Sequence, residues 1–102
     1  MPKKSKKVRP PIHPGEILLE DFLKPLGISA NKLARELRVP SNRIVKIVNG
    51  ERGITADTAL RLARFFNMTP DFWMNLQSHY DLEKAQDEIA GVIERDVRPR
   101  AA

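Results

Sequence analysis

The stretch SANKLARELRVPSNRIVKIVNG, residues 29–50, decides the fold, because its apolar residues form two short helical stripes joined by a tight turn. Each stripe repeats at the spacing of an α-helix, and only residues 38–40 separate the two. Leu33, Ala34 and Leu37 form the first stripe, and Ile44, Ile47 and Val48 form the second. The spacing predicts two helices that cross closely, the arrangement of a helix-turn-helix.

The residues at the ends of these two helices support the prediction. Ser29 is suited to cap the first helix, since its hydroxyl can accept a hydrogen bond from a free backbone amide. Arg38 occupies the position after that helix, where a left-handed backbone and glycine are usual, so we expect a strain on the order of 1 kcal/mol there. The second helix is expected to start at residue 40 or 41 and to stop at the asparagine-glycine pair 49–50.

Three further helices are expected around this pair. One starts at His13-Pro14 and ends by residue 27, and a second runs from a cap at Thr55 to a left-handed terminator at Asn67. The third starts after Thr69 and passes residue 85, and from residue 91 onward the apolar residues are too sparse to decide between a further helical turn, a strand and a loose tail. No internal repeat and no alternation of strands with helices occurs in the sequence, so the predicted fold class is all-α, with five helices.

The outward side of the second motif helix carries side chains that bond base edges or phosphates. In a helix-turn-helix the amino-terminal part of this helix enters the major groove, where an asparagine amide can pair with adenine and an arginine or lysine with guanine. Cationic and amide groups that flank the helix are placed to hold phosphates. The predicted base contacts are Ser41, Asn42, Arg43 and Lys46, and the predicted phosphate contacts are Lys32, Asn49 and Arg52.

Those residue types alone would be an ordinary solvated helix face. Their coincidence with the short turn, with the small Ala34 at the crossing and with a positive charge balance favours sequence-specific binding of double-stranded DNA instead.

Charge and proline content divide the chain into three parts. The 102 residues carry a net charge of +5, of which residues 1–9 contribute +5, residues 10–70 contribute +3 and residues 71–102 contribute −3. Residues 1–12 are expected to form a basic, extended arm that is either solvated or follows phosphates or a minor groove. Residues 13–90 are expected to form the DNA-binding domain with a dimerisation helix, and residues 91–102 a C-terminal tail.

Composition argues against catalysis and against a membrane. The chain has no cysteine, and its two histidines lie near Glu16 and Asp81 without the spacing of a metal site or a triad. We therefore expect no enzyme activity, no cofactor, no metal and no small-molecule substrate. No run of eighteen apolar residues exists, and no apolar segment follows the basic amino terminus, so no membrane association and a cytoplasmic location are expected.

Several strings together resemble the HigA-type antitoxins, a branch of the phage-repressor-like (XRE) helix-turn-helix class. They are HPGEIL at 13–18, the motif above, NGERGITADTA at 49–59, FWMNLQ at 72–77 and YDL at 80–82, so the resemblance covers about residues 13–82. It implies a small cytoplasmic homodimer that binds a palindromic operator at its own promoter. It also implies a cognate toxin of the RelE-like ribonuclease fold, whose mRNA cleavage the antitoxin blocks. Ser41, Asn42, Arg43 and Lys46 fall where that class contacts bases and nearby phosphates, whereas Arg38 departs from its usual glycine.

The surfaces for a second copy and for a toxin are less constrained by the sequence. Aromatic and long apolar residues crowd into residues 72–80. We expect Phe72 and Leu76 to close the core, and Trp73, Met74 and Tyr80 to form the symmetric dimer contact. For a basic toxin, either the acidic tract or the basic arm is a candidate docking segment, and the tract is otherwise a solvated helix face. The tract comprises Asp81, Glu83, Asp87 and Glu88.

Two other classes of function share parts of this pattern. A stand-alone transcription regulator would keep every DNA contact and lack a toxin gene next to its own. A protein-interaction module without DNA activity would lose nothing on replacement of Arg43 and Lys46.

Overall fold

Five helical segments follow one another in the computed structural model, which describes residues 10–101. No strand occurs in that range, and the predicted all-α, five-helix fold is confirmed. Of the basic arm predicted over residues 1–12, positions 1–9 lie outside the described residues, and positions 10–12 form no regular element. The elements are α1 (Pro14–Ile17), η1 (Leu18–Leu23) and α2 (Lys24–Leu26), which run on as one helix, then α3 (Ala30–Leu37), α4 (Ser41–Val48), α5 (Ala56–Phe66) and α6 (Pro70–Asp96).

Three of the five helical segments begin at a residue whose side chain accepts a hydrogen bond from the backbone, namely His13, Ser29 and Thr55. The Ser29 hydroxyl accepts a hydrogen bond from the backbone N–H of Lys32 at 3.0 Å, as predicted. The Thr55 hydroxyl accepts a longer one, at 3.5 Å, from the N–H of Thr58. Thr69 holds the cap position of α6 without a side-chain hydrogen bond. Caps therefore fix where most of the helices begin.

The first helical segment contains a π-helical turn, η1, that was not predicted from the sequence. In this turn the backbone N–H of Lys24 donates to the carbonyl of Leu19, five residues earlier. Residues five apart then share nearly one side of the helix, which explains why Leu18 and Leu23 are both buried. Pro25 follows at once and cannot donate a backbone hydrogen bond, so the regular ladder is interrupted there as well.

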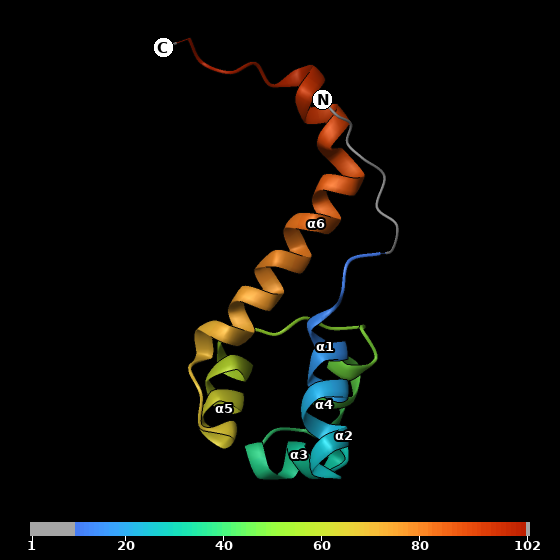
Figure 1. The fold of residues 1–102 in the computed structure, drawn as a ribbon, viewed down its shortest axis with the longest axis vertical. Coiled ribbons are helices and arrows are strands. Elements are labelled where there is room, and N and C mark those ends of the chain that lie inside the picture. The colour runs from blue at the N-terminus through green and yellow to red at the C-terminus, as the bar shows by residue number, and fades with distance from the viewer. Residues whose placement is uncertain (1–9, 102) are drawn as a thin grey trace.

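One apolar core connects all five segments. Phe22 of η1 lies with its ring centroid 4.9 Å from that of Phe66 of α5 and 4.9 Å from that of Trp73 of α6. From α3 and α4 the buried residues of the two stripes face this core, namely Leu33, Ala34, Leu37, Ile44 and Ile47. In Figure 1, α3 closes one end of the domain, and α5 and the α1–α2 segment stand on opposite sides. The core residues are Leu18, Leu23, Leu33, Ala34, Leu37, Ile44, Ile47, Ile54, Ala59, Leu62 and Trp73.

The position of Trp73 in the structure differs from the predicted one. The sequence predicts Trp73 in the dimer contact and Phe72 in the core, but the structure buries Trp73 completely and leaves Phe72 37% exposed. Both neighbours are aromatic, so the pattern alone could not decide which one faces inward. The contacts of Trp73 with Phe22 and Phe66 decide it, and its indole has no surface to offer a second copy.

Helix α6 passes residue 85, as predicted. It crosses the expected boundary at residue 90 and ends at Asp96, so the first residues of the predicted tail are helical. Figure 1 shows its second half extending away from the other helices, and every residue from 86 to 101 is exposed. Among the described residues, no helix is both long and apolar enough to cross a membrane.

Candidate nucleic-acid interface

The turn between α3 and α4 is fixed by backbone hydrogen bonds. The N–H of Val39 donates to the carbonyl of Ala34 at 3.0 Å, and the N–H of Arg38 donates to that of Arg35 at 3.2 Å. This pair of bonds is the Schellman arrangement, which needs a left-handed residue after the helix. Arg38 has φ of 62° and ψ of 44°, so the predicted left-handed backbone without glycine is confirmed. The turn thereby sets the angle at which α4 leaves α3.

Helix α1 supports α4 from behind through Gly15. A Cβ atom at this position would lie 1.7 Å from the carbonyl oxygen of Ile47, which no side chain could tolerate. Only glycine lets the two backbones approach so closely. Ile44 and Ile47 are fully buried on the same side of α4. Its opposite side is therefore the one left for a ligand.

The predicted base-contact residues lie on this outer side, and one of them, Arg43, is less exposed than the other three. Ser41, Asn42 and Lys46 are exposed. Arg43 is held against α5, where its Nη1 donates to Oδ1 of Asp57 at 2.8 Å and its side chain is 23% exposed. Three of the four side chains are thus free for a partner, and the fourth is already oriented by a carboxylate.

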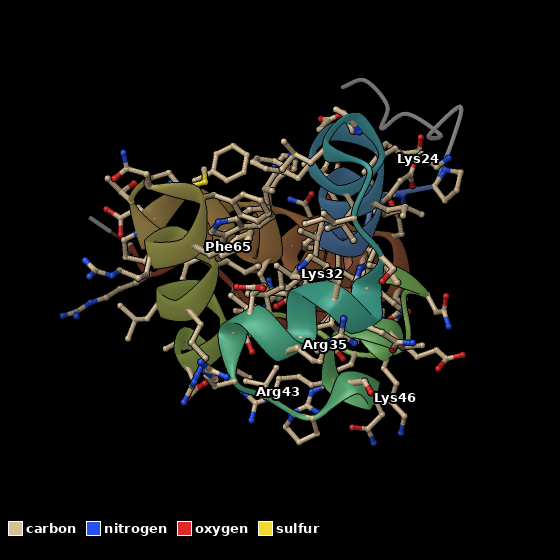
Figure 2. The ribbon with its side chains drawn as sticks, turned by 90° about the horizontal axis from the view of Figure 1, so that it is seen from below. Lys24, Lys32, Arg35, Arg43, Lys46 and Phe65 are labelled. Atoms are coloured by element: carbon tan, nitrogen blue, oxygen red, sulfur yellow. The ribbon has the colours of Figure 1, made fainter. Side chains whose placement is uncertain are left out.

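The predicted phosphate-contact residues are also exposed. Lys32 lies on α3 with its Nζ 3.4 Å from a carboxylate oxygen of Glu36, and Asn49 and Arg52 follow the end of α4. Exposed Arg35 was missed by the sequence analysis, although it lies three residues after Lys32 on the same helix and so on nearly the same face. Figure 2 shows Arg35, Arg43 and Lys46 on one side of the domain.

Asp57 joins α3, α4 and α5 through two arginines. Its Oδ1 accepts from Arg43 and also from Nε of Arg61 at 2.7 Å. Arg61 in turn donates from Nη1 to the carbonyl of Leu37, at the end of α3, at 2.8 Å. The hydrogen bonds from Arg61 and Arg43 lower the pKa of the Asp57 carboxyl, which therefore stays ionised at neutral pH. The sequence held no signal for this contact between residues 14 positions apart.

The loop after α4 is held from the other side by α6. Oε1 of Gln77 accepts from the backbone N–H of Ile54 at 2.7 Å, and Nε2 of Gln77 donates to Asp81 at 3.0 Å. Tyr80, predicted to face a second copy, is half-buried and meets the ring of His13 edge to face, with centroids 4.9 Å apart. Residues 10–101 contain no group of three or more side chains suited to holding a metal ion.

This geometry recurs in known proteins. A helix-turn-helix family model matches residues 19–73. Virulence-associated protein I of Dichelobacter nodosus is 54% identical over 79 residues, which are 78% of this chain and 73% of that protein.

Among the solved structures that match nearly the whole chain are two antitoxins. An addiction module antidote protein of the HigA family from Coxiella burnetii has a TM-score of 0.85 at 52% identity, over 90% of this chain and 100% of that one. The Pseudomonas aeruginosa antitoxin HigA with the higBA promoter has a TM-score of 0.87 at 46% identity, over 89% of this chain and 99% of that one. The chain therefore belongs to the XRE-type helix-turn-helix family, in its HigA-like antitoxin branch.

Proposed function

We propose that this protein is a DNA-binding antitoxin that recognises an operator at its own promoter and represses transcription. The observation that carries the proposal is the rigid α3–turn–α4 unit, with Ser41, Asn42 and Lys46 exposed on the side opposite the core. A relative of nearly the same length and fold was solved with a promoter, which supports the same use of this surface.

Two kinds of contact follow from the positions of the side chains. Asn42 and Lys46 lie in the first two turns of α4, from which base edges are read. Lys32 and Arg52 lie outside α4 and would hold phosphates, which adds affinity without selecting sequence. Ser41 belongs to the proposed base contacts, and Asn49 to the proposed phosphate contacts.

A homodimer is part of the proposal, because one module of this size reads few base pairs. Two copies on a palindrome would present their α4 helices about 34 Å apart. Met74 and Phe72 are each 37% exposed on α6 and are the apolar side chains that we assign to the symmetric contact. Tyr80 would contribute only the part of its ring that His13 leaves uncovered.

The proposed second partner is a toxin of the RelE-like ribonuclease fold, with residues 81–96 of α6 as its docking segment. This segment has a net charge of −4, which complements the cationic surface that a ribonuclease needs to hold RNA. It also exposes an apolar stripe on helical spacing. The stripe consists of Leu82, Ile89, Val92 and Ile93, each at least 45% exposed.

Mobility shifts with a duplex from the region upstream of the gene test the DNA-binding part. Asn42→Ala or Lys46→Ala is expected to cost roughly 1 to 3 kcal/mol of binding free energy and to relax preference at one operator position. Lys32→Ala or Arg52→Ala should weaken binding to all sequences alike and reduce the salt dependence by about one ion per site. If the two classes of variant behave identically, the assignment of roles is wrong.

Co-purification with the product of the adjacent reading frame tests the toxin. Capture of a basic ribonuclease would support an antitoxin. A mobility shift of the operator without any co-purified partner would instead support a stand-alone transcription regulator.

A further inference from the structure

The Asp57 carboxylate lies where the amino-terminal end of α5 meets the first turn of α4. It is the second residue of α5, and it binds the third residue of α4, Arg43, at 2.8 Å. A base-reading arginine would be expected to extend freely from its helix. Here its side chain is only 23% exposed and is already ordered before any ligand arrives.

The contact with Asp57 leaves a defined part of the guanidinium available. The group offers two forks of paired donors, Nη1 with Nη2 and Nε with Nη2, and either can bind a planar pair of acceptors. Asp57 engages Nη1, and the structure shows no hydrogen bond from Nε or Nη2 of Arg43 to any described residue. The remaining fork is the one that can meet O6 and N7 of a guanine.

The Asp57 side chain is held in place by a second arginine, so its contact with Arg43 has a defined geometry. Its Oδ1 also binds Nε of Arg61, and Arg61 reaches the carbonyl of Leu37 at the end of α3. The carboxylate is therefore anchored to the same turn that sets the angle of α4. An arginine held in this way loses less conformational entropy on binding than one that must be ordered by the DNA.

We propose that Asp57 is a positioning residue for base recognition: it holds the guanidinium of Arg43 so that its free fork reads one base pair of the operator. The inference rests on the proposed DNA-binding function and adds a specificity determinant that does not itself contact DNA. A carboxylate beside a polyanion weakens binding, so the ordering of Arg43 must offset this repulsion for Asp57 to improve recognition.

The test measures dissociation constants for the promoter duplex and for its single-base-pair variants. Arg43→Ala should lose discrimination at one base pair by about tenfold. Asp57→Asn should lose discrimination at that same base pair by a smaller factor of roughly three to five, while affinity for unrelated duplexes rises because an acid is removed. In the double variant, Asp57→Asn should have no further effect at that position.

Two controls separate positioning from charge and from packing. Glu36→Gln removes an acid from neighbouring α3 and should raise affinity for every duplex by one common factor. Arg61→Met removes one anchor of Asp57 but keeps the bond between Asp57 and Arg43, so discrimination should fall by less than in Asp57→Asn. Asp57→Ser serves as a second variant if Asp57→Asn does not fold, since serine is tolerated near a helix start.

Three results would overturn the inference. They are a uniform change in affinity for Asp57→Asn, an effect additive with that of Arg43→Ala, or an equal loss of discrimination for Arg61→Met. A wild-type protein with no preference for its promoter would instead refute the proposed function itself.

Discussion

The imidazole of His13 serves the fold in its neutral form. Its Nδ1 accepts a hydrogen bond from the backbone N–H of Gly15 at 2.9 Å, which requires an unprotonated nitrogen. Its ring packs against Tyr80, so that the start of α1 is joined to α6. Burial lowers the pKa of His13, and the nearby negative charge of Asp81 offsets this only in part. Protonation should therefore oppose folding.

The sign of the pH dependence follows from this lowered pKa. Below the unfolded value of 6.5 the unfolded chain binds a proton that the folded chain resists, so stability falls as pH decreases through that value. We expect the melting temperature of the wild type to fall between about pH 7.5 and about pH 5.5, and to change less in His13→Asn, which keeps a capping acceptor. Parallel thermal melts across this range check it. A wild-type curve as flat as that of the variant would contradict the role given to His13.

At the scale of elements, the close crossing of α1 over α4 means that replacing glycine by alanine should change stability in opposite directions at two helical sites. Replacing glycine by alanine inside a helix normally adds roughly 0.5 to 1 kcal/mol of stability. At Gly15 the added methyl would meet the carbonyl oxygen of Ile47, whereas at Gly91, in α6, it would meet nothing within 4 Å.

Gly15→Ala is expected to lower the melting temperature and to weaken operator binding, because α4 must move to accommodate the methyl. Gly91→Ala is the matched control, and it should raise the melting temperature slightly and leave operator binding intact. Circular dichroism melts and mobility shifts on the two variants check the pair. Equal stability of the two would show that the close backbone approach is not maintained in solution.

The starts of the helices and the helix-turn-helix motif were predictable because their causes are local. Ser29 accepts from a backbone amide three residues on, and Arg38 takes the left-handed conformation that the short turn demanded. What failed has causes beyond the local sequence. The inward turn of Trp73 depends on Phe22 and Phe66, and the Asp57–Arg43 bond depends on how α5 meets α4. Periodicity fixes which residues share a face, but it does not decide between two adjacent aromatic residues.

At the scale of the whole molecule, the two proposed partners would meet different parts of the chain. The second half of α6 extends away from the domain in Figure 1, and Figure 2 views the domain from the end opposite to it. In that view Arg35, Arg43 and Lys46 lie together on one side of the domain, on α3 and α4. The basic groups are thereby separated from the segment of net charge −4 at residues 81–96. Such separation would let a toxin and an operator bind to one chain at once.

Substitutions on the exposed stripe of α6 should therefore act on toxin capture alone. Leu82 and Ile89 are 63% and 45% exposed and make no part of the core, so the double variant Leu82→Gln, Ile89→Gln should fold normally. We expect it to bind the operator as the wild type does and to lose co-purification with the adjacent toxin by tenfold or more, since roughly 1.4 kcal/mol of lost apolar contact suffices. Leu26→Gln, at a leucine 58% exposed before α3, is the matched control and should retain the toxin. Full capture by the double variant would exclude this stripe as the docking surface, and a loss of operator binding in parallel would assign it to the dimer contact instead.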